Sequence, residues 1–402
     1  MRSRRVAALI SVALLAAGCG SHRSERPRRP VFGRAGVVRI ALAQLPWPLD
    51  PARARGRDEL AVARAIFSTP LRTDPGTGAL RPALCADWSG SADGRTWRFR
   101  CRHASAIAAE LRRTHLLRGR VEAPGQRRLV VRLRAPDPEL PYALTEVAAA
   151  PPGVPGPFRV VSAGPRRIVA ERRGLRLEFR KLEPHAALGL YRRGRLDEAP
   201  VPLGDLRALE RDTRLRGDVR VRRLFAVDLV VFEPKGSLAG QPELRRVYDE
   251  TANRADYEAL VTEFAAPAAE NLTDRGEPDA RAAVLAARRG RRRIKSLPRL
   301  AVRFAPPADP DLAYGESLLV ASWRDAGLGA FVGPGRPDAR LERVLAPYPK
   351  VEALRAAVAG EQIAPIAWVA DARLVSPRLR GWREDELGAV DYTGVRALHT
   401  GT

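Results

Sequence analysis

AIFSTPLRTDPGTGALRPALCADWSGSADGRTWRFRCR, residues 65–102, is the stretch that decides the fold of this chain. Its second half has the pattern of a β-hairpin, because two segments that carry aromatic residues flank the turn sequence Ser91-Ala92-Asp93-Gly94. A helix and a further strand are predicted after this hairpin, since residues 104–113 have helical spacing and residues 127–133 have an apolar centre flanked by arginines. The stretch therefore predicts a small β-sheet unit that starts with a tight hairpin.

The register of this hairpin brings two cysteines together. Folding about the centre of the turn places Cys85 opposite Cys101 and Trp88 near Arg98. Outside the cytoplasm a facing cysteine pair can oxidise, and the short loop that it closes contributes about 3 kcal/mol on the chain-entropy model. We expect a disulfide between Cys85 and Cys101, with two free buried thiols as the alternative.

The first 20 residues, MRSRRVAALISVALLAAGCG, have the features of an export signal. Arginines precede an apolar run from Val6 to Ala17, which is too short to cross a bilayer core that needs about 20 residues. The end of the run, Leu15-Ala16-Ala17-Gly18-Cys19, resembles a bacterial lipobox, whose cysteine is diacylated with chains such as palmitate. The resemblance implies a lipoprotein signal peptide over residues 1–18 and lipidation of Cys19 on the extracytoplasmic face of the cell membrane. A plain secretory signal that ends in cysteine is the alternative.

The charge of the chain bounds its partners. Of its 402 residues, 70 are Lys or Arg and 46 are Asp or Glu, which gives a formal net charge of +24. Such a charge raises the question of nucleic acid, but the arginines are spread along the whole chain, as the codon bias of a GC-rich genome would spread them. The densest basic run, residues 288–293, is interpreted as a solvated loop. We expect no nucleic-acid partner, and anionic lipid headgroups or an acidic wall suit the charge better.

Motifs that carry catalysis or metal binding are missing. The sequence has no HExxH, GxSxG, Walker or CxxC motif. The histidines are scattered and none is paired with another at metal-ligand spacing; they are His22, His103, His115, His185 and His399. We therefore expect no enzyme activity, no catalytic residue, no metal and no cofactor.

Strands and helices alternate irregularly along the chain, which indicates an α/β protein of more than one lobe. Residues 19–36 are rich in Arg, Pro, Ser and Gly and are interpreted as a flexible tether. We expect a first lobe over residues 37–232 that includes the hairpin-bearing subdomain, about 51–150. A shortened second lobe over 233–380 and a return to the first lobe over 381–402 complete the division.

Several segments, in order, resemble the extracytoplasmic solute-binding proteins of peptide and nickel ABC importers, known as family 5. They are the opening strand and Leu-Asp-Pro over 37–54, the hairpin run over 65–102, the Gly-Pro strand over 154–160, the helix pair over 244–260 and the C-terminal crossing over 372–395. Twelve positions of the hairpin run match the family pattern: Phe67, Leu71, Thr77, Gly78, Pro82, Leu84, Trp88, Asp93, Gly94, Trp97, Phe99 and Arg102. The family's Ala and second Leu are replaced by Cys85 and Cys101, a joint change that favours a bridge.

The resemblance implies a two-lobed α/β fold of the periplasmic-binding-protein type II kind, with mixed sheets and an extra small subdomain. It also implies a lipid-anchored binding protein that captures an oligopeptide or similar small solute between its lobes and delivers it to an ABC permease. In the family the chain crosses the ligand cleft after the opening strand, which here is Asp50–Asp58 with Arg53 and Arg55. Trp368, near the end of a strand that returns to the hinge, is a third candidate ligand contact. The alternatives are solvated loop charges for the arginines and a core position for the tryptophan.

One departure from the family leaves the ligand open. The segment from Gly333 to Lys350 is interpreted as a Pro/Gly-rich connection, whereas the family has a longer segment here that forms one wall of the cleft. The aspartate that anchors a peptide amine in the family has no evident counterpart. A degenerate family member that has lost transport and binds a partner protein or a cell-envelope component is therefore the alternative function.

Overall fold

The computed structural model describes most of the chain after the predicted tether. The described residues are 36–51, 54, 56–74, 79–114, 117–145, 154, 156–262, 280–294, 300–307, 310–345, 357–385 and 388–398. The predicted signal peptide, Cys19, Arg53 and Arg55 lie outside them, as does the predicted tether apart from Gly36.

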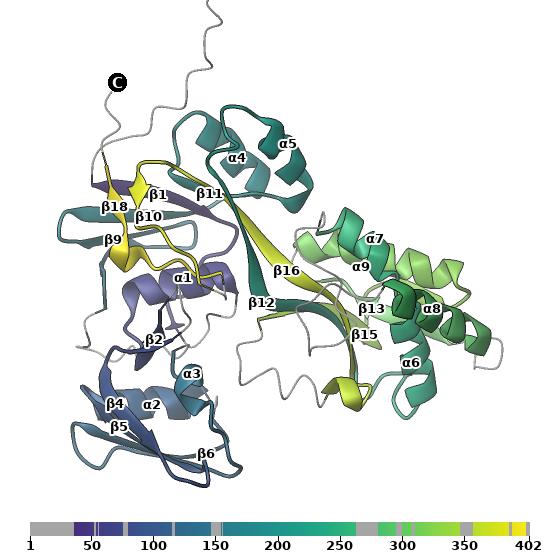
Figure 1. Cartoon of the computed structure of the whole chain (residues 1–402), viewed down its shortest axis with the longest axis horizontal. Coiled ribbons are helices and arrows are strands. Elements are labelled where there is room, and N and C mark those ends of the chain that lie inside the picture. The colour runs from purple at the N-terminus through teal and green to yellow at the C-terminus, as the bar shows by residue number, and fades with distance from the viewer. Residues whose placement is uncertain are drawn as a thin grey trace, which may run out of the picture.

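One mixed sheet of ten strands runs through the molecule (Figure 1). Its strands are β1 (Val37–Leu42), β8 (Arg159–Ala163), β9 (Arg167–Arg172), β10 (Leu175–Lys181), β11 (Glu198–Pro200), β12 (Val219–Phe232), β13 (Ala301–Ala305), β14 (Gly329–Val332), β15 (Ala339–Leu345) and β16 (Ile363–Val375). They lie in the order β14-β13-β15-β12-β16-β11-β1-β10-β9-β8. Two of them, β12 with 14 residues and β16 with 13, are long enough to belong to both halves of the molecule. The predicted α/β class with mixed strand directions is confirmed.

The first lobe is built from both ends of the chain. Strand β1 pairs in parallel with β10 and β11, and the helices α1 (Arg57–Ile66), α4 (Pro184–Arg192) and α5 (Leu206–Arg211) accompany this half of the sheet. Its buried core combines Val38 and Ile40 from the start of the chain with Val390 and Tyr392 from the end. Residues 376–398 therefore return to the lobe in which the described chain begins, and they include the short pair β17 (Leu379–Arg380) and β18 (Arg396–Ala397).

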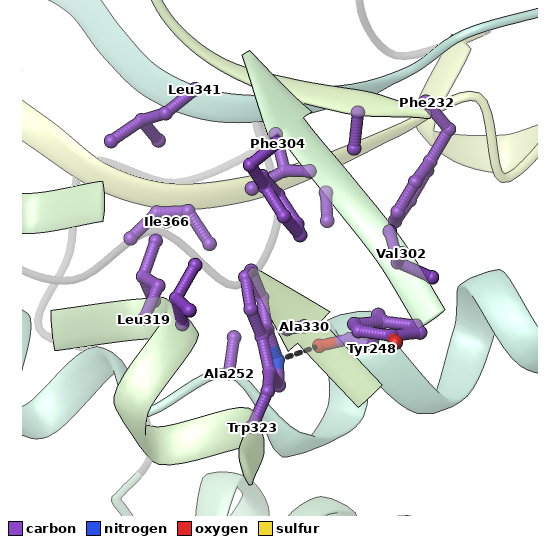
Figure 2. Packing of buried hydrophobic residues seen from close by; sticks show 14 of the residues in the cluster. Phe232, Tyr248, Ala252, Val302, Phe304, Leu319, Trp323, Ala330, Leu341 and Ile366 are labelled. Carbon is purple, nitrogen blue, oxygen red and sulfur yellow. Dashed lines mark hydrogen bonds between the residues drawn. The ribbon is translucent and has the colours of Figure 1, made fainter. Parts of the chain in front are cut away.

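The second lobe packs its helices against the other half of the sheet. The helices are α6 (Pro242–Thr251), α7 (Arg254–Leu260), α8 (Ala280–Ile294) and α9 (Pro310–Asp325). Figure 2 shows the centre of its core, where Trp323 stacks on Phe304 with ring centroids 5.0 Å apart and meets the edge of Tyr248. The indole N–H of Trp323 is satisfied because it donates to the backbone carbonyl of Tyr248 at 3.0 Å. This core is separate from that of the first lobe.

A small subdomain extends from the first lobe (Figure 1). Its sheet contains β4 (Cys85–Gly90), β5 (Thr96–Cys101), β6 (Gly119–Glu122) and β7 (Arg128–Leu133) in the order β4-β5-β7-β6, and α2 (Ala104–Thr114) packs on it. The short pair β2 (Leu71–Thr73) and β3 (Leu80–Pro82) and the helix α3 (Leu140–Ala143) join it to the lobe. Cys85 and Cys101 form a disulfide, with their Cα atoms 3.7 Å apart.

The hairpin register differs from the expectation by one residue beyond the disulfide. Cys85 faces Cys101, but the strand bulges before Asp87, so Trp88 faces Phe99 instead of Arg98. A bulge places two residues opposite one, and the hydrophobic alternation of so short a strand does not reveal it.

Two sequence interpretations of local structure were wrong. The basic run 288–293 is part of α8 and not a loop, since the apolar residues of the preceding turns continue the helical spacing. The interpreted connection 333–350 contains the strand β15, which pairs with β12 from Ala339 to Leu345. The charged residues Arg340, Glu342 and Arg343 make the sequence of β15 look like a connection. The strand forms because it pairs with β12, which is distant in the sequence.

None of the described helices combines the length and the apolarity that crossing a bilayer requires.

Candidate functional site at the junction of the lobes

The two lobes are joined by β12 and β16, whose pairing is interrupted where they pass from one lobe to the other. On the first-lobe side Arg223 pairs with Ala370, and on the second-lobe side Val227 pairs with Trp368. Three residues of β12 therefore oppose one residue of β16. At this interruption Leu224, Ala226 and Val369 form a buried cluster of their own, outside both lobe cores. We call residues 224–226 with Val369 the crossing.

Directly beside the crossing, on the first-lobe side, lies a buried cluster of titratable groups. Its centre is Arg373 of β16, a side chain that is only 1% exposed. The Arg373 guanidinium contacts four carboxylates: Glu198 at 2.6 Å, Asp371 at 2.8 Å, Asp58 at 3.2 Å and Glu384 at 3.5 Å. Through Arg373 the cluster therefore connects α1, β11, β16 and the returning chain next to the crossing.

The carboxylates of this cluster have further partners. Glu198 accepts hydrogen bonds from the indole N–H of Trp382 at 2.9 Å and from the hydroxyl of Tyr392 at 3.0 Å. Asp58 accepts from the backbone N–H of Ala43 at 2.7 Å, just after β1. Each buried charge is therefore paired or hydrogen-bonded, as burial in a low-dielectric interior requires.

Two members of the cluster have opposite pKa shifts. Burial raises the pKa of Glu384, and the adjacent Asp371 raises it further, so this carboxyl holds its proton at neutral pH. Burial also acts to raise the pKa of Asp371, but Arg57 and Arg373 outweigh it and hold that pKa below its usual range. Of these two neighbouring groups, Glu384 therefore favours the protonated form and Asp371 the ionised form.

Arg57 connects the cluster to the crossing. Its guanidinium pairs with Asp371, while its side chain is 21% exposed, more than any other member of the cluster. A Cβ atom added at Gly388 would lie 3.1 Å from Leu224 and 3.2 Å from Arg57, so the three residues meet at the crossing. Sequence reasoning did not single out Arg57, although it lies in the segment Asp50–Asp58 that was expected to cross the cleft.

Of the three predicted ligand contacts, the structure describes only Trp368. Trp368 lies on β16 next to the crossing and is 5% exposed, in a small buried cluster on the face of the sheet opposite the core of Figure 2. Its indole N–H is buried and has no hydrogen-bond partner among the residues that the structure describes. Arg53 and Arg55 lie outside the described residues, so their role in a site with Trp368 stays a prediction. Their neighbour Asp50 is held by the guanidinium of Arg113 at 2.7 Å, which ties this loop to α2 of the subdomain.

A separate hollow of about 260 Å³ lies within the first lobe and its subdomain. It is bounded by the end of α1, by β2 and by the returning chain, and its charged lining consists of Arg64, Arg72, Arg102, Asp385 and Asp391. Arg64 and Asp385 pair with each other. None of its lining residues comes from the second lobe, so this hollow is not the space between the lobes. Within the described residues no group of histidine, cysteine or carboxylate side chains is arranged to hold a metal ion.

Comparison with known proteins identifies the fold. No family model matches the sequence, and no curated protein matches it either. The solved structures do match. The murein tripeptide binding protein MppA of Escherichia coli superposes with a TM-score of 0.76 over 92% of this chain and 99% of that chain, at 15% identity. OppA of Haemophilus influenzae in complex with the peptide RPPGFSPFR gives 0.75 over 91% and 99%, at 14% identity.

A second structure of MppA, its unliganded open form, gives a TM-score of only 0.63 over 92% of this chain and 99% of that chain, at 14% identity. Both matched proteins are family 5 solute-binding proteins, so the resemblance in the sequence motifs is confirmed at the level of the fold. This chain has the two-lobed fold of the periplasmic binding proteins.

Proposed function

We propose that this chain is an exported, lipid-anchored substrate-binding protein of an ABC importer, which captures an oligopeptide or similar small solute between its two lobes. The observation that carries the proposal is the crossing. Two lobes with separate cores are joined by two strands, and the pairing of these strands is interrupted where they pass between the lobes. A break of this kind lets rigid lobes rotate while the strands stay continuous, which is the hinge closure used by binding proteins.

The buried cluster supports this mechanism by keeping one side of the hinge fixed. Arg373 and its carboxylates join α1, β11, β16 and the returning chain, so the first lobe reaches the crossing as a single body. A solved MppA structure with this fold is an unliganded open form, which agrees with lobes that move apart when no ligand is bound. Binding by closure needs no covalent chemistry, so the proposal includes no enzyme activity.

For the ligand we propose contacts from both sides of the crossing. Trp368 has a buried indole N–H with no hydrogen-bond partner among the described residues, and a polar ligand atom would satisfy it. Arg53 and Arg55, on the loop that precedes α1, would favour a carboxylate or phosphate, because guanidinium pairs bidentately with such groups. A solute with one anionic group and an apolar portion fits this combination.

Thermal denaturation with a panel of short peptides and small anions tests solute binding. A ligand present at about 100 times its Kd adds about 2.7 kcal/mol to the stability, which should raise the Tm by a few degrees. We expect the Trp368→Phe variant to lose about tenfold in affinity for that ligand, whereas Trp88→Phe, a matched change in the subdomain, leaves it unchanged.

The same panel decides between the alternatives. If binding survives Arg53→Ala with Arg55→Ala, these arginines are not part of the site. If no compound of a broad panel stabilises the wild type, the degenerate, partner-binding function replaces solute capture. A gene next to permease and ATPase genes agrees with transport, and one next to envelope-assembly genes agrees with the alternative.

Fractionation of cells that express Cys19→Ser tests the anchor. The wild type is expected in the membrane fraction, because two acyl chains on one cysteine give stable attachment. We expect the variant in the soluble fraction or as unprocessed precursor. The result that contradicts the prediction is a processed variant that still partitions with membranes as the wild type does.

A further inference from the structure

The described chain begins at the tip of the hairpin formed by β9 and β10. The carbonyl of Gly36 accepts a hydrogen bond from the backbone N–H of Arg176 at 2.7 Å. A Cβ atom at Gly36 would lie 2.6 Å from the carbonyl oxygen of Gly174, so the backbones touch and only glycine fits there, at a φ of +78°. The segment that joins the fold to Cys19 therefore leaves the protein beside this hairpin tip.

This end of the first lobe is strongly basic. Between residues 158 and 181, which form β8, β9 and β10, the chain has eight cationic side chains and two carboxylates. Both carboxylates are already engaged: Glu171 pairs with Arg159, and Glu178 pairs with Arg167 at 3.0 Å, with Arg180 at 3.1 Å and with Arg176 at 3.5 Å. The positive charge is thus far from neutralised within the lobe.

Three arginines at the tip have no carboxylate partner among the described residues. Arg173 is exposed and occupies the turn at a φ of +43°, Arg172 lies over the ring of Phe158, and Arg396 stands on β18. A hollow of about 370 Å³ is lined by Arg172, Arg173 and Arg396 together with Gly36. We call these three arginines with Gly36 the basic end.

The length of the predicted tether keeps the basic end near the membrane. Residues 19–36 form a chain of 18 residues, and a flexible chain of that length has an end-to-end distance of about 25 Å. This exceeds the Debye length of about 8 Å at physiological salt, beyond which the attraction between lobe and lipid is screened. The tether therefore allows the lobe to contact the membrane but does not hold it there. Where the lobe settles then depends on which of its surfaces the membrane attracts.

We propose that the basic end docks on the anionic lipid surface to which the chain is anchored. Arg172, Arg173 and Arg396 face the phosphate groups, and Gly36, at which the described chain begins, lines the same hollow as these arginines. Docking would orient the molecule with β8–β10 toward the lipid and the second lobe away from it, so the second lobe stays free to move. The inference takes the direction of the membrane from the proposed anchor at Cys19, but the charge of the basic end does not depend on that anchor.

Vesicle sedimentation tests the docking without a lipid anchor. The probe protein is the mature chain from residue 19 with Cys19→Ser, mixed with vesicles of phosphatidylcholine alone or with added phosphatidylglycerol. We expect binding only to the anionic vesicles and its loss at high salt. Each arginine near an anionic surface contributes about fivefold, so changing Arg172, Arg173 and Arg396 to Gln should weaken binding on the order of a hundredfold.

The matched control carries the same loss of charge elsewhere. Arg288, Arg291 and Arg292 are exposed on α8, which lies at the opposite side of the molecule from β9 (Figure 1). Changing these three to Gln should weaken vesicle binding less than fivefold. Equal losses in both variants would mean that only net charge matters, and they would overturn the proposal. So would the absence of binding to anionic vesicles, or docking that requires an acidic protein in place of lipid.

Two further measurements separate this proposal from the others. The thermal transition of both triple variants should match that of the unchanged probe protein, which excludes misfolding as the cause of lost vesicle binding. Solute binding should be the same in all three proteins, because the basic end is remote from the crossing. A failure of the docking test therefore leaves the solute-binding proposal untouched, and the reverse also holds.

Discussion

Replacing Arg373 with Met is expected to lower the free energy of unfolding by about 3–5 kcal/mol, the loss that follows when one partner of a buried ion cluster is removed. The guanidinium is only 1% exposed and contacts Asp58, Glu198 and Asp371 within 3.2 Å. Met fills much of the space, but it removes the positive charge that offsets these buried carboxylates. Urea unfolding followed by circular dichroism measures the change.

Arg100→Met provides the matched control for this prediction. Arg100 also pairs with a carboxylate, that of Asp87, but its side chain is 69% exposed and the pair is solvated. Exposed pairs contribute about 0–1 kcal/mol, so this variant should retain nearly all of the stability. A loss below 1 kcal/mol for Arg373→Met would contradict the view that the cluster fixes the first lobe at the crossing.

Removal of the disulfide by Cys85→Ala with Cys101→Ala should cost the subdomain about 3 kcal/mol. The bond closes a loop with a sequence separation of 16, and the loss of that cross-link returns conformational entropy to the unfolded chain. Both cysteines are buried among the apolar residues of the subdomain, so the truncated side chains add a smaller packing loss. Hydrogen exchange of β4, β5 and β7 measures the local stability.

The wild type treated with a reductant is the control that keeps both side chains in place. It should lose nearly the same local stability as the double variant, because the cross-link and not the thiol is responsible. Exchange in α6 and α9 of the second lobe should remain unchanged in both samples. If reduction leaves exchange in the subdomain unaffected, the loop-closure explanation is wrong.

Local signals in the sequence were sufficient for much of the fold. The turn residues Asp93 and Gly94 predicted the hairpin, and folding about this turn predicted the pairing of Cys85 with Cys101, which the structure confirms. These features depend on residues that are close in the sequence. The family resemblance then supplied the arrangement of the lobes.

Features that depend on distant partners were not predictable. The long strands β12 and β16 each continue from an apolar part through an arginine-bearing segment into the first lobe, and no local pattern marks that continuation as a strand. Arg373 looks like a surface residue in the sequence. Its burial depends on Asp58 and Glu198, which lie 315 and 175 positions away and which no local pattern connects to it.

The candidate site was predicted only in outline. Trp368 was singled out because it lies on the returning strand, and the structure places it next to the crossing. Arg57 was missed because no local pattern distinguishes a paired, half-buried arginine in the first turn of a helix from a solvated one. Only pairing with Asp371 of β16 gives Arg57 its position.

In the sequence, the second lobe lies between two segments of the first lobe. This determines the order in which the two lobes can finish folding during synthesis. Residues 233–362 form one uninterrupted length, so the helices of the second lobe and its shorter strands emerge together. The first lobe must wait, because β11 pairs with the far end of β16, where Glu198 meets Val375, and its core needs Val390 and Val395. The early residues of the first lobe outside the subdomain, whose own core lies within residues 71–154, therefore remain without their full set of partners until the last part of the chain arrives. Contacts across such separations form slowly, and during that interval the unfinished lobe is the part of the protein most exposed to proteases and to aggregation.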